Sequence, residues 1–248
     1  MKTFLPFLCF ALCAGSLPAQ MPASNKDFQS VRIIETMTPA FPEDLIPTFR
    51  NGGYARVEIS VTEEGKLGEW LVTGYTHRRF ADAAMEAIKE WTFEPARLMG
   101  EPISVSITLT FNFEVKGVVI STTGSDSVTA RFNEMLGNVD SAYTTCTLRE
   151  LDRIPVPRKT VVPLYGKALA DRGVNGEVTV EFYIDEQGTV RMPFVLGRPD
   201  VALANLAVDA VRQWSFEPPT RQGRPVLVHV RQLFQFKPTS PAETAARL

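Results

Sequence analysis

The sequence contains the same phrase twice, 123 positions apart. Residues 88–95 read Ile-Lys-Glu-Trp-Thr-Phe-Glu-Pro, and residues 211–218 read Val-Arg-Gln-Trp-Ser-Phe-Glu-Pro. Sliding the chain by 123 positions aligns residues 53–113 with residues 176–236 without a gap. The shared residues are mostly glycines, prolines, aromatic residues and small apolar residues, which shape a backbone and fill a core. The repetition therefore indicates one scaffold built twice, and 248 residues are enough for two small domains.

Each copy predicts two strands, a helix and a final strand. Apolar and polar residues alternate at 57–61 and 178–184, as in a half-buried strand, and glycine-containing turns follow. A long final strand is predicted at 103–113 and 226–236 by the same alternation. The helix between them is predicted by apolar residues at one face, namely Phe80, Ala84, Ala87, Ile88 and Trp91, and then Leu203, Ala207, Ala210, Val211 and Trp214.

Two residues of the second copy refine this pattern. Asp200 stands where it can cap the start of the second helix. Pro193 falls inside the second strand, and proline is confined to sheet edges and bulges because it lacks an amide donor. The final strand should therefore pair on the other side of the first strand.

The predicted fold class is α+β. Two repeated small domains each form a three-stranded antiparallel sheet (β-β-α-β, order 2-1-3) with a helix on one face. The final strand then has an open outer edge, and a long open edge invites pairing with another chain.

The two termini and the connector complete the predicted organisation. Lys2 precedes a short apolar run and a small-residue exit, which is typical of a secretory signal peptide cleaved after Ser16 or Ala19. An uncleaved membrane anchor is the alternative interpretation. We predict five segments: a signal peptide at 1–19, a first domain at 37–115, a connector with a short helix at 116–159, a second domain at 160–237 and a flexible tail at 238–248.

The composition argues against several classes of function. The net charge is −2, which disfavours nucleic acid as a partner because neutralising phosphates requires a basic surface. Cys146 is the one cysteine beyond the signal peptide, so the mature chain has no intrachain disulfide. The sequence shows no Gly-rich phosphate loop, metal-ligand cluster or nucleophile elbow, and His77 and His229 occupy non-equivalent positions in the repeats. We therefore predict a protein that is not an enzyme and uses no cofactor or metal.

A combination of motifs points to a known family. Pro39-Ala-Phe-Pro42 precedes the first strand, and the second copy begins with Pro163-Leu-Tyr-Gly166. Both copies continue with the Gly hairpin, then Trp-x-Phe-x-Pro, Gly-x-Pro and a closing Phe-x-Phe. Together these motifs resemble the C-terminal domain of the TonB energy-transducer family, over about 37–115 and 160–237.

The resemblance implies a periplasmic domain that binds the Ton box of outer-membrane TonB-dependent receptors. In that family a receptor strand is added to the open edge of the sheet, and an inner-membrane motor pulls on it. This sequence departs from a complete transducer. Its N-terminal apolar run is shorter than the roughly 20 residues that span a bilayer, it shows no long Pro-rich spacer, and the domain occurs twice.

We therefore expect a periplasmic protein-binding module that takes Ton-box-like peptides by strand addition. One alternative is an anchored TonB-type energy transducer in receptor-driven transport. Another is a structural envelope protein that self-associates through its sheet edges. The sequence identifies neither the partner nor whether both copies bind. The predicted binding residues lie on the polar side of the two final strands: Ser104, Ser106, Thr108 and Thr110 in the first copy, and Leu227, His229, Arg231 and Leu233 in the second.

Overall fold

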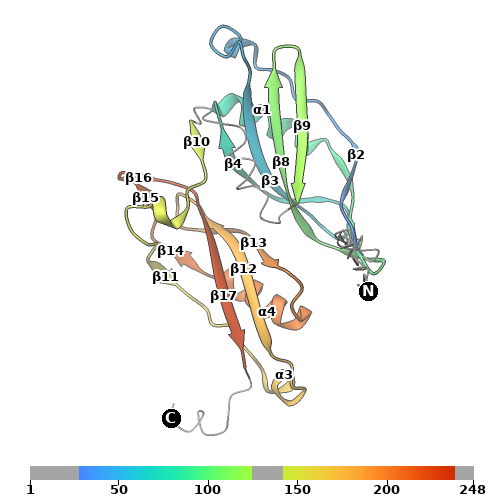
Figure 1. Cartoon of the computed structure of the whole chain (residues 1–248), viewed down its shortest axis with the longest axis vertical. Coiled ribbons are helices and arrows are strands. Elements are labelled where there is room, and N and C mark those ends of the chain that lie inside the picture. The colour runs from blue at the N-terminus through green and yellow to red at the C-terminus, as the bar shows by residue number, and fades with distance from the viewer. Residues whose placement is uncertain (1–27, 125–141, 238–248) are drawn as a thin grey trace, which may run out of the picture.

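A computed structural model of the chain describes residues 28–124 and 142–237. Figure 1 shows two α+β domains, the N-terminal one above the C-terminal one. The predicted signal peptide at 1–19, the connector helix expected at 125–136 and the predicted tail at 238–248 lie outside the described residues. The α+β class and the mainly antiparallel sheets are confirmed.

The first domain contains a five-stranded antiparallel sheet in the order β10-β4-β3-β8-β9. The prediction of three strands is therefore wrong for this domain, because one strand is added at each edge. The helix α1 (Arg78–Lys89) packs on one face. The strands are β3 (Gly53–Val61), β4 (Leu67–Tyr75), β8 (Val105–Glu114), β9 (Gly117–Gly124) and β10 (Tyr143–Thr144).

The second domain contains a three-stranded antiparallel sheet in the order β13-β12-β17. Pro193 lies in the edge strand β13, beside a shift in register between Glu181 and Tyr183. The helix α4 (Val201–Val211) covers one face, and the short helix α3 (Lys167–Asp171) precedes the sheet. The strands are β12 (Gly176–Ile184), β13 (Val190–Leu196) and β17 (Val228–Phe236).

Short strands frame each sheet in a similar way. A strand leading into each domain pairs with the Trp-x-Phe segment, and a small hairpin follows that segment. In the first domain these are β2 (Arg32–Glu35) with β5 (Thr92–Glu94), and β1 (Phe28–Gln29) with β6 (Ala96–Leu98) and β7 (Glu101–Ile103). In the second they are β11 (Pro157–Lys159) with β14 (Ser215–Phe216), and β15 (Thr220–Arg221) with β16 (Arg224–Pro225). The 3-10 turns η1 (Glu43–Leu45) and η2 (Leu148–Glu150) complete the fold.

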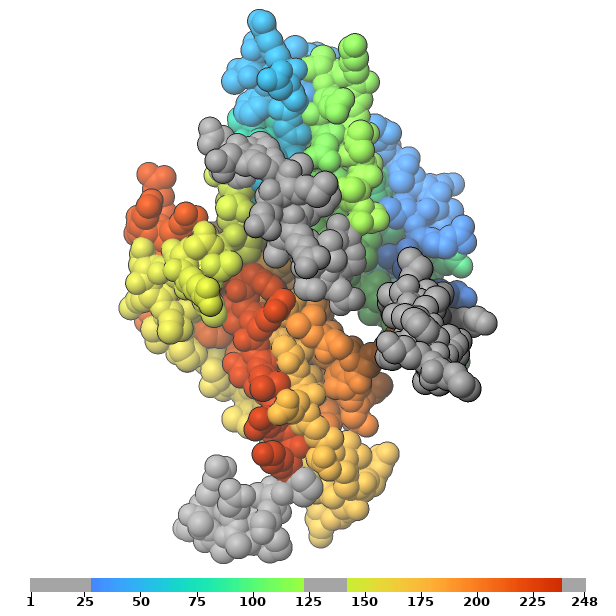
Figure 2. Space-filling view, viewed as in Figure 1, coloured from blue at the N-terminus to red at the C-terminus, as the bar shows by residue number. Residues whose placement is uncertain are grey.

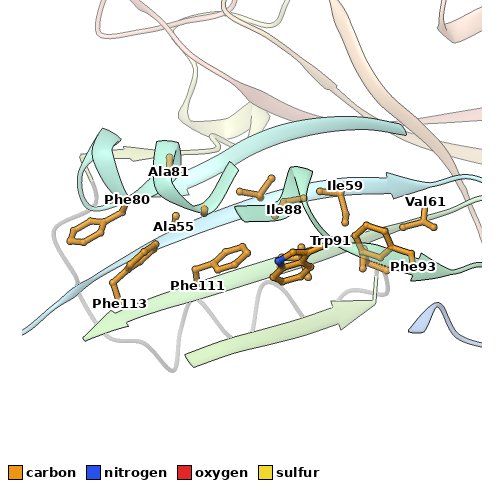
Figure 3. Close-up of a cluster of buried hydrophobic side chains, with 14 of the residues drawn as sticks. Ala55, Ile59, Val61, Phe80, Ala81, Ile88, Trp91, Phe93, Phe111 and Phe113 are labelled. Carbon is orange, nitrogen blue, oxygen red and sulfur yellow. The ribbon is translucent and has the colours of Figure 1, made fainter. Parts of the chain in front are cut away.

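The repeated tryptophan makes the same hydrogen bond in both domains. Trp91 is 5% exposed and closes the core between α1 and β8, as Figure 3 shows. Its Nε1–H donates to the carbonyl of Met37 at 2.9 Å, and the Nε1–H of Trp214 donates to the carbonyl of Val161 at 2.8 Å. Each tryptophan thus fills the core and also ties down the segment that leads into its domain. Trp214 is only half-buried, so the second core is less enclosed.

The hairpin glycine recurs because it touches the Trp-x-Phe segment. Gly65 and Gly188 both have positive φ, 74° and 86°. A Cβ on Gly65 would lie 2.5 Å from the carbonyl oxygen of Phe93, and one on Gly188 would lie 2.0 Å from that of Phe216. Only glycine combines this backbone conformation with so close an approach.

The two helices begin with different caps at equivalent positions. The Asp200 carboxylate accepts from the backbone N–H of Ala202 at 2.9 Å, which confirms the predicted cap of α4. In the first domain the equivalent residue is His77, and its Nδ1 accepts from the N–H of Arg79 at 3.2 Å. This role of His77 was not predicted, because histidine is an uncommon helix cap.

Candidate partner-binding edges

The outer edge of β8 in the first domain is occupied by the chain itself. The strand β9 pairs with β8 from Ile107 opposite Gly124 to Glu114 opposite Gly117, through a two-residue turn. The opposite edge of this sheet is also covered, because β10 pairs with β4. The open edge predicted for the first final strand is therefore wrong, and the cause is a strand inside the segment that we assigned to the connector.

The predicted first-domain residues are accordingly not gathered on an open edge. Thr108 and Thr110 are buried, Ser106 is half-buried, and Ser104 lies just before β8. The sequence does contain a signal for β9 that our prediction missed. Glu114-Val-Lys-Gly117 is a turn-like stretch, and Val118-Val-Ile120 follows it at once, as the second arm of a hairpin would.

The outer edge of β17 in the second domain is occupied only at its start. The backbone N–H of Cys146 donates to the carbonyl of Leu227 at 2.8 Å, and the N–H of His229 donates to the carbonyl of Cys146 at 3.0 Å. Within residues 28–124 and 142–237, no other segment pairs with this edge. Figure 2 shows β17 at the surface of the second domain.

The hydrogen bonds to Cys146 fix which backbone groups of β17 face outward. Alternate residues of an antiparallel strand point their N–H and C=O groups to the same side. Since the backbone N–H of His229 points away from β12, the backbone groups of Arg231, Leu233 and Gln235 point to the same side. The edge therefore directs the N–H and C=O groups of these residues outward, and the C=O of Leu233 accepts from the side chain of Gln232 at 2.9 Å.

The four residues predicted on this strand do not form one surface. Leu227 is fully buried against Leu71 and Met192, at the contact between the domains. His229 is half-buried, and its backbone N–H is already paired with Cys146. Arg231 and Leu233 are exposed on the open part of the edge.

The helix-facing side of β17 is less covered than its equivalent. Val230, Gln232 and Phe234 are half-buried. Their counterparts in β8 are Ile107, Leu109 and Phe111, which are 8%, 0% and 0% exposed. The difference is consistent with the extra strand, because Val118 and Ile120 of β9 pack against the first core.

The polar face of the second sheet carries a compact charge cluster. The Glu181 carboxylate forms ion pairs with Arg231 and with His229, the latter at 3.4 Å. Burial pushes the pKa of Glu181 upward, but the hydrogen bonds and positive charges of His229 and Arg231 outweigh it and hold the pKa below its usual value. Arg231 is therefore already neutralised, although its side chain is 56% exposed.

The repeat-equivalent carboxyl of the first domain behaves in the opposite way. Glu58 is 3% exposed and accepts from the hydroxyl of Tyr183 in the second domain at 2.5 Å. Burial raises the pKa of Glu58 to about 7, against the lowering effects of the Tyr183 hydrogen bond and of His229, while Glu181 and Glu69 add to the rise. The same repeated position thus has a lowered carboxyl pKa in the second domain and a raised one in the first.

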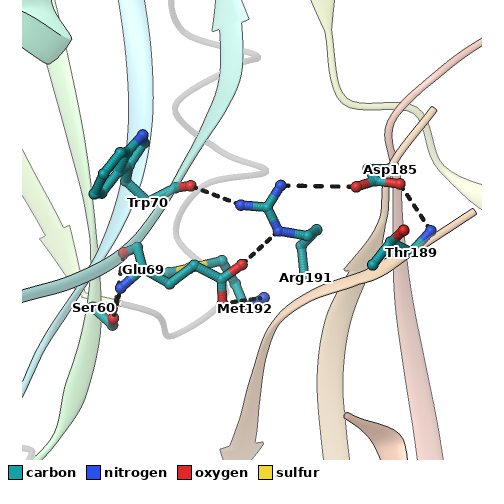
Figure 4. Close-up of polar contacts among 7 residues, drawn as sticks. All are labelled: Ser60, Glu69, Trp70, Asp185, Thr189, Arg191 and Met192. Carbon is teal, nitrogen blue, oxygen red and sulfur yellow. Dashed lines mark hydrogen bonds and ion pairs between the residues drawn. The ribbon is translucent and has the colours of Figure 1, made fainter. Parts of the chain in front are cut away.

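A second set of polar contacts joins the two domains beside this cluster. Figure 4 shows Arg191 of β13 reaching Glu69 and the carbonyl of Trp70 on β4, at 2.5 and 3.2 Å. The other oxygen of Glu69 accepts from the N–H of Met192 at 3.2 Å. The edge strand β13 therefore contacts the first domain through the Arg191 side chain and the N–H of Met192.

The described residues offer little for chemistry of another kind. Within the two described ranges, no group of three His, Cys, Asp or Glu side chains is placed to hold a metal ion. The same ranges contain no helix with the length and apolar character needed to cross a membrane.

Comparison with known proteins adds a family match over both repeats. A family model described as the Gram-negative bacterial TonB protein C-terminal domain matches residues 38–115 and 161–238. Among curated proteins, the chain is similar to Protein TonB of Vibrio cholerae serotype O1, with 28% identity over 88 residues. That stretch covers 35% of this chain and 36% of the relative, so the match spans about a third of each.

Proposed function

The chain belongs to the family of Gram-negative bacterial TonB protein C-terminal domains, and from this membership we propose that it is a non-enzymatic protein-binding module of the periplasm. Each repeat is a TonB-like energy-transducer domain. The proposed partners are outer-membrane receptors that present a Ton-box-like peptide. The proposed mode is addition of the partner's strand to a sheet edge.

The observation that carries this proposal is the unpaired outer edge of β17. Arg231, Leu233 and Gln235 direct backbone donors and acceptors outward with no pairing strand among the described residues. An added strand would pair with them and supply affinity through the backbone. The corresponding edge of the first domain is closed by β9. We therefore assign binding to the second domain and a supporting role to the first.

An anchored energy transducer is the second candidate, and the similarity to Protein TonB of Vibrio cholerae favours it. The two candidates differ in the N-terminus of the mature protein. Intact-mass measurement of exported protein distinguishes them, because removal of the predicted 1–19 segment separates the chain from any anchor located there.

The test of binding places proline on the open edge. In Leu233→Pro the lost N–H faces outward, so the internal β12–β17 ladder keeps its hydrogen bonds. We expect this variant to remain folded and to bind a synthetic Ton-box peptide at least tenfold more weakly, as measured by fluorescence anisotropy. The control Leu233→Ala keeps the N–H and should bind within threefold of the parent. Unchanged binding by folded Leu233→Pro would exclude this edge as the site.

A further inference from the structure

One layer of the second domain is formed by α4 together with the segment that leads into the domain, the lead-in segment (residues 156–172). The carbonyl of Val161 accepts from the indole of Trp214, which follows α4. The ring of Tyr165 packs against the second core and contacts that of Phe236, with 5.9 Å between the centroids. The lead-in segment and α4 therefore cover the same face of the sheet, and their outward sides form one surface.

Three apolar side chains protrude from this surface. In the lead-in segment the residues between the inward-facing Val161 and Tyr165 alternate, and Val162 and Leu164 are 78% and 84% exposed. At the start of α4, Val201 is 72% exposed. Large apolar side chains that protrude together, rimmed by polar ones, are typical of an interaction surface, because moving them out of water is favourable.

Basic side chains surround these apolar ones. The lead-in segment contains four basic residues and one acidic residue: Arg158, Lys159, Lys167 and Arg172, against Asp171. All four basic residues are exposed, and none forms an ion pair with another described residue. On the outer side of α4, Asp209 is matched by Arg212 at 3.9 Å. The surface is therefore locally positive, although the whole chain has a net charge of −2.

The equivalent segment of the first domain has the opposite charge. Glu35 and Lys159 lie opposite equivalent residues of β5 and β14, which fixes the alignment of the two segments. Residues 33–48, the equivalents of 157–172, contain three acidic residues and no basic one. Four exposed positions differ in kind between the domains: Glu35, Thr38, Ala40 and Glu43 stand in the first where Lys159, Val162, Leu164 and Lys167 stand in the second. Because one scaffold accepts both sets, folding alone does not require the basic and apolar set.

We propose that this surface docks the second domain on an anionic phospholipid bilayer. Such a bilayer offers negative head groups to the lysines and arginines, and an apolar interior close beneath them to Val162, Leu164 and Val201. Each basic side chain near an anionic lipid surface strengthens binding about fivefold. A bilayer also accepts protruding side chains without the fitted surface that a soluble protein partner would need. The inference goes beyond the proposed peptide site and does not involve β17.

The surface is accessible in the folded chain, because the contact between the domains lies on the other face of the second sheet. In β12, Phe182 points into the core beneath α4, and its neighbour Tyr183 points to the opposite face, where it reaches Glu58 of the first domain. Figure 1 shows α3, which belongs to the lead-in segment, at the end of the second domain that is remote from the first. Docking through this layer therefore leaves the contact between the domains intact.

Vesicle binding tests the inference with residues 20–248, which contain every described residue and lack the apolar run of the predicted signal peptide. Co-sedimentation with vesicles of equal parts phosphatidylglycerol and phosphatidylcholine measures binding, and vesicles of phosphatidylcholine alone are the comparison. Two double variants install the residues of the first domain: Lys159→Glu with Lys167→Glu, and Val162→Thr with Leu164→Ala.

A matched control makes the same change in net charge elsewhere. Arg50→Glu with Lys116→Glu reverses two exposed basic residues of the first domain. Circular dichroism checks that each variant is folded, which we expect because every substituted side chain is exposed. Ton-box peptide binding, measured in parallel, tests the proposed function alone, because none of these substitutions lies on β17.

We expect the parent to bind the anionic vesicles at least tenfold more strongly than the phosphatidylcholine vesicles, and to bind them less strongly as salt is added. Each lead-in double variant should bind at least tenfold more weakly than the parent, and the control within twofold of it. No binding by the parent at low salt would overturn the inference. An equal loss in the control would overturn it too, because binding would then follow overall charge. Loss in the lysine variant alone, with Val162→Thr and Leu164→Ala unchanged, would show a contact without insertion and exclude docking on a bilayer through the apolar side chains.

Discussion

The two domains share a scaffold but differ at their edges. The first sheet has five strands, with β9 and β10 added outside the repeated core, and the second has three. The added strand β9 begins immediately after the repeat ends, and in the second copy the chain continues there with Pro238 instead of a turn-like stretch. The comparison shows that a few residues outside a repeated unit decide whether its final strand is an internal strand or an edge strand.

The same comparison separates two buried carboxyls. Glu58 and Glu181 are equivalent in sequence, but Glu58 faces the hydroxyl of Tyr183, and Glu181 faces His229 and Arg231. Their pKa values shift in opposite directions from the same starting value. The surroundings of a repeated residue thus decide the direction of its pKa shift, and for Glu58 they include Tyr183 and His229 of the neighbouring domain.

The largest expected difference between the domains concerns the repeated tryptophan. Trp91→Ala should destabilise the first domain by about 3–5 kcal/mol, because Trp91 is enclosed and its loss leaves a cavity. Trp214→Ala should cost about 2 kcal/mol, because the half-buried ring leaves a site that water can enter. Urea unfolding monitored separately for each domain measures both. Equal costs would mean that the second core is as closed as the first.

The opposite shifts of the two glutamates predict opposite dependences on pH. Glu58 has a pKa of about 7 in the folded chain, above its ordinary value of 4.5. The protonated Glu58 therefore contributes fully to the free energy of unfolding below pH 4.5, and this contribution is lost as the pH rises through 7. The loss amounts to about 3 kcal/mol. Glu58→Gln should remove this decline in the free energy of unfolding, measured between pH 5 and 8.

Glu181 gives the contrasting half of this experiment. The pKa of Glu181 is lowered in the folded chain. The ionised Glu181 therefore stabilises the fold at pH values above the ordinary pKa of a glutamate, and this stabilisation is lost as the pH falls. Glu181→Gln should destabilise the protein at pH 8, because it leaves Arg231 without its buried partner. If both glutamine variants gave the same pH profile, the two environments would not differ as the structure indicates.

Proline at equivalent edge positions separates an internal strand from an open one. Thr110 and Leu233 are repeat equivalents, but Thr110 lies opposite Ser121 of β9. Thr110→Pro should cost about 1–3 kcal/mol, because it leaves an acceptor of β9 unpaired. Leu233→Pro should change stability by less than about 0.5 kcal/mol. Thermal unfolding of the two variants compares them, and a large loss in Leu233→Pro would place another strand on β17.

The smallest expected effect concerns the contact between the domains. Arg191→Met should reduce stability by about 1 kcal/mol, because the Glu69 pair is partly exposed and solvent screens it. Added salt should lower the stability of the parent, because it screens the ion pair, and it should change the stability of Arg191→Met little. The difference in stability between the two proteins should therefore shrink. Chemical unfolding at low and high salt measures both, and a salt-independent loss would point to packing by the Arg191 stem instead of charge.

The sequence alone determined the scaffold of each repeat. The alternation of apolar and polar residues predicts the strands, and the apolar helix faces predict the helices. Pro193 predicts that β13 is an edge strand, and the structure confirms this. These features are readable because each depends on side chains whose polarity or geometry differs from residue to residue. Most of the core residues named from the pattern are buried.

Only the tertiary structure decided which edge is open, which face is shared and which carboxyl has a raised pKa. Leu227 follows the pattern of an edge residue but is buried by Leu71 and Met192 from two different strands. Glu58 has the sequence context of a solvated strand residue until Tyr183 covers it. Pairing at an edge uses backbone N–H and C=O groups that nearly every residue carries, so the sequence of β17 cannot state whether a strand lies beside it. Whether a strand is paired there depends on the path of the rest of the chain. Among the described residues, the strand β9 pairs with β8, and no equivalent strand pairs with β17.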